Sequence, residues 1–294
     1  MLHVYCIKGF SSFDMGSALR RPVELAWHSS IYLPPTCQYT YNDCSFVHTR
    51  SGIDIACQLV TNDADVQRRW TAGQEYTDSR MLYLFSHGNA CDISTCNIQW
   101  ALSVLDGNVL KWDYPGYGQS TDEYVCEQSI CESIEAMYAL CRRMKVPAEK
   151  LVIVGQSLGS VPSLFLASRC YVHAHAVLLI SPLASAFRTM FADGWVPERL
   201  TKYMDGILFD NLKHASGVRV PVAIIHGLHD DVVNVSHVAL LMQKFPTHAR
   251  YPPLKLDAGH NDVVASHHQA AIQAYFERFI THCATSNAHM TPYD

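Results

Sequence analysis

One five-residue motif and its flanking segments constrain this chain more than any other feature. Residues 151–154 are apolar and three of the four are β-branched, which predicts a buried strand. The motif Gly-x-Ser-x-Gly follows at 155–159, and the apolar stretch 161–167 suits a helix. A strand, a sharp turn and a helix would hold Ser157 at a cramped backbone position with its hydroxyl above the sheet. Glycines on both sides of the serine remove the β-carbons that would clash there.

Two loops downstream of this serine carry the groups that could activate it. Residues 221–226 predict another buried strand, which ends in a loop with an aspartate pair at 230–231. Residues 251–256 could form a further strand that leads to His260. The order serine, acid, histidine, each at a strand end, is one of the known arrangements of a catalytic triad. His260 would take the proton of Ser157, and the carboxylate would orient the imidazole.

Length and composition exclude several other classes of protein. The 294 residues suffice for one large α/β domain, and a net charge of −5 without a Lys/Arg cluster argues against a nucleic-acid partner. Eleven scattered cysteines without C-x-x-C spacing favour a reduced, cytoplasmic protein. No apolar run approaches the roughly 20 residues of a membrane span. The sixteen histidines match no zinc spacing, so no metal or cofactor is expected.

The rest of the chain alternates strand-like and helix-like patterns. Residues 1–40 show no clear period and are predicted to be an irregular N-terminal segment. From 41 to 294 we expect one α/β domain, a mostly parallel sheet with helices on both faces. The segments that predict it are a hairpin over 45–48 and 53–60, strands at 81–85 and 109–112, and helices at 130–144 and 272–280.

An insertion at about 183–218 interrupts this alternation and is rich in large apolar residues. We interpret it as a small cap over the serine that supplies apolar walls for an acyl chain. The simpler alternative is that it only covers hydrophobic sheet surface. The residues expected to bind substrate are Phe187, Met190, Phe191, Trp195 and Tyr203.

A serine nucleophile also needs N–H donors for the oxyanion of its tetrahedral intermediate. One would be the backbone N–H of Leu158, directly after the nucleophile. The other is expected from the loop after strand 81–85, with Asn89 the first choice and Ala90 the second. The alternative for this loop is a plain turn. His87 is interpreted as a structural residue that bonds the loop.

Six short motifs stand in one order along the chain. They are Phe-Ser-His-Gly-Asn-Ala (85–90), Asp-Tyr-Pro-Gly-Tyr-Gly (113–118), Gly-Gln-Ser-Leu-Gly (155–159), Ser-Pro-Leu (181–183), Ile-His-Gly-x-x-Asp (225–230) and Gly-His-Asn-Asp (259–262). In this combination the chain resembles the α/β-hydrolase-domain family that includes the depalmitoylases of membrane-bound signalling proteins. The resemblance runs from about residue 33 to the C-terminal helix.

The resemblance implies an α/β-hydrolase fold and the triad Ser157, Asp230 and His260, with Asp230 preferred over its neighbour Asp231. It also implies hydrolysis of the thioester between palmitate and a protein cysteine. Family members that act on membrane proteins carry an N-terminal cysteine cluster, whereas this chain has only Cys6 near its start. A single acyl chain supports only weak, reversible membrane association. Looser relatives are labelled prolyl-oligopeptidase-like serine peptidases.

The sequence therefore predicts a serine hydrolase that works through an acyl-enzyme. The best single prediction is protein depalmitoylation, with an acylated protein or a small acyl ester as substrate and the oligomeric state left open. One alternative is a small serine peptidase or short-chain esterase on the same triad. Another, from a different class, is a non-catalytic binding protein, because the same fold serves many functions.

Overall fold

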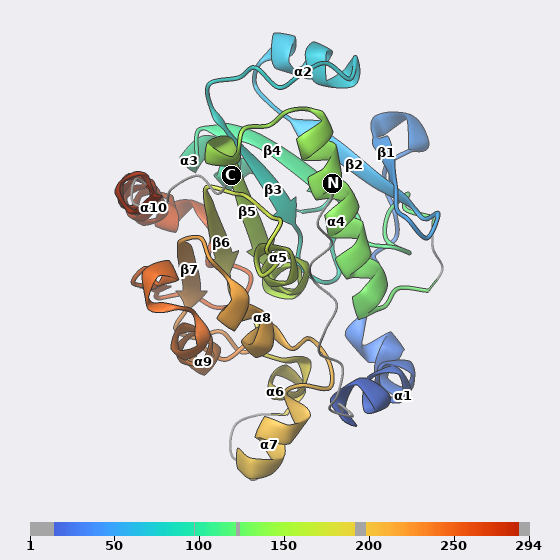
Figure 1. The fold of residues 1–294 in the computed structure, drawn as a ribbon, viewed down its shortest axis with the longest axis vertical. Helices are drawn as coiled ribbons and strands as arrows, with labels where there is room; N and C mark the ends of the chain where they lie inside the picture. Colours follow the sequence, from blue (N-terminus) through green and yellow to red (C-terminus); the bar gives the residue numbers. More distant parts are fainter. Residues whose placement is uncertain (1–14, 97, 122–123, 192–197, 288–294) are drawn as a thin grey trace, which may run out of the picture.

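An eight-stranded sheet forms the centre of the molecule (Figure 1). The computed structural model describes residues 15–96, 98–121, 124–191 and 198–287. The strand order is β1-β2-β4-β3-β5-β6-β7-β8, with β1–β2 and β2–β4 antiparallel and all other pairs parallel. The strands are β1 (Ser45–His48), β2 (Asp54–Val60), β3 (Met81–Ser86), β4 (Gly107–Trp112), β5 (Leu151–Gln156), β6 (Ala176–Ile180), β7 (Val222–Gly227) and β8 (Leu254–Leu256).

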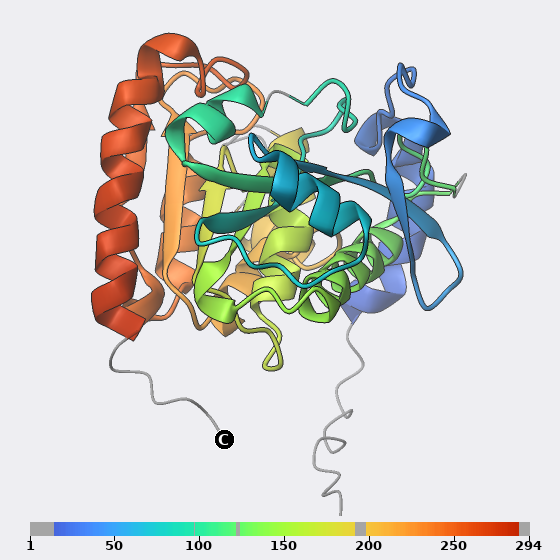
Figure 2. The same ribbon diagram turned by 90° about the horizontal axis from the view of Figure 1, so that it is seen from above.

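Both faces of this sheet are buried, and the side chains of each central strand divide between two hydrophobic cores. In β5, Ile153 packs in one core, while Val152 and Val154 pack in the other. Helices α4, α5 and α9 cover the first face, and α3 and α10 cover the second (Figure 2). The helices described are α1 (Met15–Ile31), α2 (Ala64–Thr71), α3 (Gln99–Val104), α4 (Glu127–Arg143), α5 (Ser160–Ala167), α6 (Ala186–Met190), α7 (Glu198–Met204), α8 (Asn211–Gly217), α9 (Ser236–Lys244) and α10 (Gln269–Asn287).

The architecture confirms the predicted fold class, a mostly parallel sheet covered by helices on both faces. The predicted hairpin is β1–β2, the two predicted buried strands 81–85 and 109–112 are β3 and β4, and the helical pattern over 130–144 is α4. The continuous apolar runs of the inner strands are typical of parallel strands buried on both sides. This is why the sequence pattern identified them.

The N-terminal segment corrects one prediction, because residues 15–31 form helix α1 rather than an irregular chain. The face of α1 turned toward the domain includes the polar residue Glu24, which is 5% exposed and whose Oε1 accepts hydrogen bonds from the hydroxyl of Tyr32 and the N–H of Glu127. Leu25 and Trp27, on either side of Glu24 on the helix, are about half exposed, at 53% and 42%. A search for an apolar stripe at helical spacing therefore misses this helix, and Pro22 inside it weakens the helical pattern further.

The region predicted as a cap divides into two parts. Helix α8 packs against α5 and α9, and its Asn211 is completely buried, so this part belongs to the body of the domain. Helices α6 and α7 project from the same end of the molecule as α1 (Figure 1). A buried ion pair between Arg188 of α6 and Asp205, just after α7, ties them together with a closest N–O distance of 2.8 Å.

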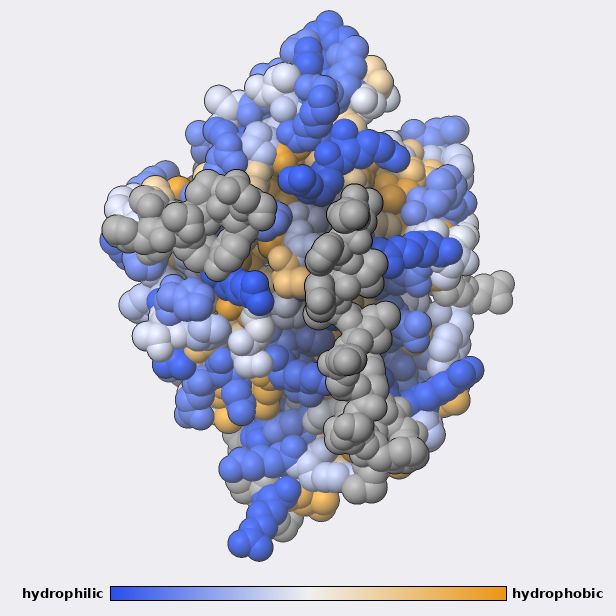
Figure 3. Space-filling view, in the orientation of Figure 1, coloured by the Kyte–Doolittle hydropathy of each residue, from blue (hydrophilic) through white to orange (hydrophobic). Residues whose placement is uncertain are grey.

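Hydrophilic side chains cover most of the face seen in Figure 3, where apolar residues form small, separate groups. Among the helices of the described ranges, none is both long and apolar enough to cross a bilayer. The ten cysteines within those ranges are all free thiols.

Candidate active site

Ser157 occupies a strained position at the turn between β5 and α5. Its φ is +51°, in the left-handed region that non-glycine residues rarely adopt. A β-carbon on Gly155 would lie 2.5 Å from the carbonyl oxygen of Gly159, and one on Gly159 would lie 2.0 Å from that of Ser86. Only glycine fits at either position, so the two flanking glycines are what allow the serine to stand in this turn.

The structure brings the three predicted triad residues together. The Oγ of Ser157 lies 3.0 Å from Nε2 of His260, and Nδ1 of His260 lies 2.7 Å from Oδ2 of Asp230. The three side chains follow β5, β7 and β8, three strands of the parallel part of the sheet. With the Nδ1 proton held by Asp230, Nε2 is free to accept the serine proton.

Asp230 is 5% exposed, and four donors surround its carboxylate. Oδ1 accepts hydrogen bonds from the backbone N–H groups of Val232 and Val233, at 3.0 and 2.7 Å. Oδ2 faces His260 at 2.7 Å and Nε2 of His226 at 3.3 Å. Burial alone would raise the pKa of Asp230, but the hydrogen bonds from the two histidines and from Val233 hold that pKa well below its ordinary value.

His226 is a member of this cluster that the sequence analysis did not single out. It is fully buried in β7, and its Nε2 lies 2.8 Å from the carbonyl oxygen of Val233 as well as near Asp230. Both neighbours are acceptors, so Nε2 carries the proton. The His-Gly-x-x-Asp spacing was the available signal, since it puts the histidine on the strand and the aspartate on the loop above it.

The neighbouring acidic residues have different surroundings. Asp231 is exposed and takes part in none of the hydrogen bonds or ion pairs found among the described residues. Asp262 accepts a hydrogen bond from the backbone N–H of Gly259 at 2.7 Å, within the loop that carries His260. Of the aspartate pair, the structure therefore places Asp230 against His260.

The loop after β3 passes directly beside the nucleophile. A β-carbon on Gly88 would lie 3.6 Å from that of Ser157. The N–H of Ala90 donates to the side-chain oxygen of Asn89 at 3.1 Å, whereas the N–H of Asn89 has no hydrogen-bond partner in the described part of the chain. Ala90, the second choice for an oxyanion donor, is thus already engaged, and the first choice is not.

A buried cluster of polar groups stabilises this loop. Nδ1 of His87 lies 2.7 Å from the carbonyl oxygen of Gly88, and Nε2 lies 3.3 Å from the carboxylate of Asp113. Asp113 also accepts hydrogen bonds from the N–H of Ile93, at 2.7 Å, and from the hydroxyl of Tyr39. His87 and Asp113 are completely buried, in keeping with the structural interpretation of His87.

The side chain of Asn89 connects the loop to the N-terminal segment, a contact that no sequence pattern announced. Its Nδ2 donates to the carbonyl oxygen of Ile31 at 2.7 Å. Its Oδ1 accepts from the hydroxyl of Tyr117 at 2.7 Å and from the N–H of Leu33 at 3.1 Å. The end of α1 is therefore attached to the loop that carries the candidate oxyanion donor.

The predicted cap residues lie on one end of the molecule rather than in one closed pocket. The ring centroids of Phe187 and Phe191 lie 4.7 Å apart, and those of Phe191 and Trp27 of α1 lie 6.2 Å apart. Met190 and Tyr203 are 37% and 44% exposed. Trp195 lies outside the described residues.

Known proteins resemble this chain in sequence over most of its length. It is 35% identical over 225 residues to alpha/beta hydrolase domain-containing protein 17B of Homo sapiens, covering 75% of this chain and 70% of that protein. It is 38% identical over 219 residues to protein 17C of Xenopus tropicalis, covering 73% of this chain and 63% of the relative. A scan against protein-family models gave no match.

Solved structures with the same fold are esterases and related enzymes. An esterase of Pyrococcus furiosus aligns with a TM-score of 0.60 at 16% identity, covering 85% of this chain and all of that one. The esterase Est1E of Butyrivibrio proteoclasticus, determined with ferulic acid bound, aligns with a TM-score of 0.61 at 15% identity, covering 82% and 99%. At these identities the likeness concerns the fold.

Proposed function

The chain belongs to the family of α/β-hydrolase domain-containing proteins and is a hydrolase, and from this premise we propose that it removes long acyl chains from protein cysteines by serine catalysis. The observation that carries the catalytic part is the continuous hydrogen-bonded series Ser157–His260–Asp230, at 3.0 and 2.7 Å. The resemblance of its six motifs to the depalmitoylase branch supports the thioester part.

In the first half of the proposed reaction, Oγ of Ser157 attacks the acyl carbonyl while Nε2 of His260 takes its proton. Asp230 keeps the other ring nitrogen protonated and stabilises the imidazolium that forms. The N–H groups of Leu158 and Asn89 donate to the oxyanion, and each such donor typically contributes about 10²–10³ in rate. The tetrahedral intermediate collapses when His260 returns the proton to the leaving sulfur or oxygen.

In the second half, a water molecule attacks the acyl-serine with His260 as the base. The ester bond to Ser157 breaks, the carboxylic acid leaves, and the hydroxyl of the serine recovers its proton through the same imidazole. No group beyond these residues and water takes part in the proposed cycle.

Apolar side chains around the triad support a lipid substrate. Leu228 and Val232 flank Asp230 on the acid loop, where they are 47% and 48% exposed. Leu33, which is hydrogen-bonded through its N–H to Asn89, is 46% exposed. A fatty chain that covered these surfaces would remove them from water, at about 25 cal/mol for each Å² of apolar area. The proposed substrate is therefore an S-acylated protein presented at a membrane surface, with the enzyme cytoplasmic and peripheral.

The test is hydrolysis of a chain-length series of p-nitrophenyl esters and acyl thioesters, from acetyl to palmitoyl. We expect kcat/KM to rise toward long chains in the wild type. Ser157→Ala should abolish turnover and fluorophosphonate labelling while the circular dichroism spectrum stays native.

A preference for acetyl or butyryl groups would contradict depalmitoylation and favour a short-chain esterase. Cleavage of peptide bonds without dependence on acyl length would favour the serine peptidase alternative. Turnover retained by Ser157→Ala would overturn the assignment of the nucleophile.

A further inference from the structure

A cavity lies away from the triad, where the antiparallel end of the sheet meets the loop between β3 and α3. Its volume is about 380 Å³, within the usual range for small-molecule sites. Figure 2 shows that α10 and α3 cover other parts of this sheet face. The polar side chains that line the cavity include Gln58, Thr61, Gln67 and Lys111.

Lys111 is the central residue of this cavity. It lies in β4 opposite Gln58 of β2, so the two side chains share one face of the sheet. The residue is only 7% exposed, and its ammonium donates one hydrogen bond, to the carbonyl oxygen of Ile93. An ammonium has three N–H donors, which leaves two that can point into the cavity.

Lys111 also lacks an ionic partner in the described part of the chain, since no carboxylate lies within 4 Å of its ammonium. Asp92 and Asp113 belong to the same region, but Asp92 Oδ1 accepts from Ser94 and Thr95, and Asp113 accepts from Ile93 and Tyr39. A buried ammonium with no carboxylate in direct contact is incompletely compensated, which costs free energy. An anion in the cavity would offset that cost.

The other polar side chains around the cavity can add donors. Thr61 accepts a hydrogen bond from the N–H of Asp63, which leaves its own hydroxyl proton to donate. The amides of Gln58 and Gln67 each use one N–H, for the carbonyl oxygen of Asp43 and the hydroxyl of Thr71, and keep the second. Such a set of donors around one cation suits carboxylate or phosphate oxygens.

We propose that this cavity is a binding site for a small organic anion carrying a carboxylate or phosphate group, held by Lys111 and the hydroxyl and amide donors beside it. The cavity is larger than one oxyanion and mostly polar, so the rest of the ligand is polar rather than a fatty chain. No residue of the candidate triad or oxyanion hole lines it.

A short series of contacts connects this site to the loop that carries Asn89. The carbonyl oxygen of Ile93 accepts a hydrogen bond from the Lys111 ammonium. The N–H of the same residue donates a hydrogen bond to Asp113 at 2.7 Å. Asp113 in turn lies 3.3 Å from His87, which bonds the loop that carries Asn89. An anion at Lys111 would therefore bind next to the support of the oxyanion loop without touching substrate.

The experiment is calorimetric titration of the full chain with inorganic phosphate and, in parallel, with succinate, with glycerol as the neutral control. We expect at least one of the anions to bind and to raise the melting temperature by mass action. Lys111→Met should weaken binding by roughly tenfold or more, the size expected for a charged hydrogen bond. Lys255→Met, at an exposed lysine of β8, should bind as the wild type does. Preference for phosphate or succinate identifies the acid group.

Because Lys111 is buried, Gln67→Glu provides a second test on an exposed side chain. The added negative charge should weaken anion binding several-fold and leave ester hydrolysis intact. Equal affinity of the wild type, Lys111→Met and Gln67→Glu for both anions would overturn the proposal. Absence of heat and of any rise in melting temperature with the wild type at about ten millimolar anion, a concentration well above ordinary ligand levels, would do the same.

Discussion

Two buried carboxylates, Asp230 beside the triad and Glu127 at the first turn of α4, have opposite electrostatic surroundings. They are 5% and 3% exposed. Asp230 accepts two backbone N–H groups from its own loop and faces two histidines. These donors hold its pKa below the ordinary value in spite of burial.

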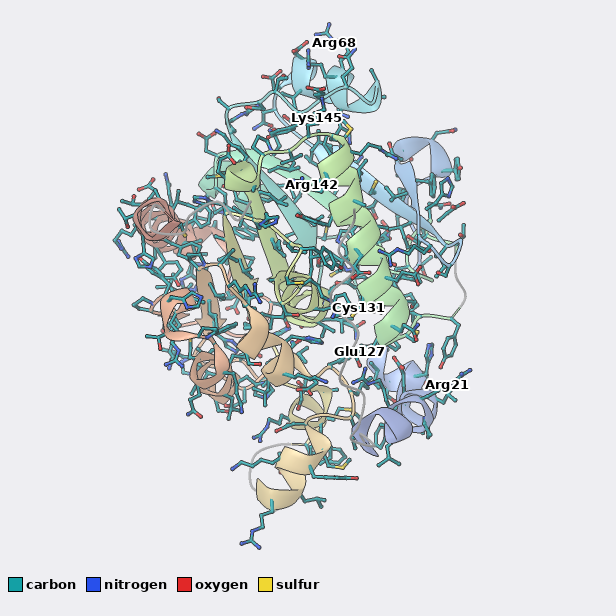
Figure 4. All side chains as sticks on the ribbon, viewed as in Figure 1. Arg21, Arg68, Glu127, Cys131, Arg142 and Lys145 are labelled. Carbon is teal, nitrogen blue, oxygen red and sulfur yellow. The ribbon has the colours of Figure 1, made fainter. Side chains whose placement is uncertain are left out.

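The carboxylate of Glu127 has fewer donors close to it. Oε2 accepts the N–H of Phe209 at 3.1 Å, and Nε of Arg20 lies 3.5 Å away. A second carboxylate, Glu24 of α1, accepts the N–H of Glu127 itself at 2.6 Å. Burial raises the pKa of Glu127, Arg20 partly opposes that rise, and Glu24 adds to it. Figure 4 shows Glu127 at the end of α4 nearest α1.

The difference follows from where the donors come from. Three of the four donors to Asp230 lie within four residues of it in sequence, so a short stretch of chain pre-organises the charge. Two partners of Glu127 are Arg20 of α1 and Phe209 of the segment before α8, which lie 209 − 20 = 189 residues apart in sequence and meet only when the domain is complete. The surroundings of Asp230 stabilise its negative charge. The charge of Glu127, where α4 meets α1, is incompletely compensated.

The largest expected effect is on the triad carboxylate. Asp230→Asn should lower kcat by about 10⁴, because an amide no longer holds the imidazole in the required tautomer. Asp231→Asn, the matched control at an exposed neighbour, should change kcat less than about twofold, as surface substitutions usually do. Steady-state hydrolysis of one ester by both variants decides the point. A larger loss in Asp231→Asn would move the acid by one residue.

An intermediate effect is expected where the two regions meet, at Asn89. Asn89→Ala keeps the backbone N–H but removes the side-chain bonds to Ile31, Leu33 and Tyr117. We expect kcat to fall by roughly 10- to 100-fold, less than loss of an oxyanion donor outright, because the loop loses its support. KM should change little.

Tyr117→Phe removes one of the Asn89 bonds and also the bond that the N–H of Leu33 donates to the Tyr117 hydroxyl at 2.9 Å. It keeps the bond of Asn89 to Ile31, so it is the milder variant and should lose less activity. An Asn89→Ala enzyme with wild-type kcat would show that the contact with the N-terminal segment does not position the loop.

The smallest effect concerns stability and its pH dependence. A carboxyl with a raised folded pKa contributes stability that is present below its unfolded pKa, near 4.3, and is lost as the pH rises through the folded value. Glu127→Gln removes this loss. The free energy of unfolding of the variant, measured by urea titration between pH 4 and 8, should therefore increase relative to that of the wild type by on the order of 1 kcal/mol as the pH rises.

Asp230→Asn should show the opposite sign. Because the pKa of Asp230 is lowered in the folded state, its contribution to stability is present above about pH 4, the unfolded pKa, and is lost as the pH falls through the folded pKa. The stability difference between this variant and the wild type should thus shrink toward acid. The same pH trend in both variants would contradict the contrast between the two carboxylates.

Much of the fold followed from local patterns that depend on few residues. The apolar runs of β3, β5 and β7 are buried on both faces of the sheet, so they stand out in the sequence. The turn at Ser157 requires glycine on both sides, and that requirement is written into the motif itself. The chain order of Ser157, Asp230 and His260 then predicted three side chains that the structure places in hydrogen-bond contact.

Helix α1 could not be predicted in this way, because polar contacts hold it to the domain. Its buried Glu24 bonds to Tyr32 and to the backbone of α4, more than a hundred residues away. The bond of His226 to Asp230 and the bonds of the Asn89 side chain likewise join groups whose residue types fit many roles.

The sequence by itself determined the sheet, the strained serine and the order of the candidate triad, because hydrophobic periodicity and steric need for glycine are local. Only the tertiary structure decided which polar groups meet. Hydrogen bonds and charges act between atoms a few ångströms apart. The position of α1, the partners of Asn89 and the surroundings of the Lys111 ammonium therefore emerge only when distant segments are packed together.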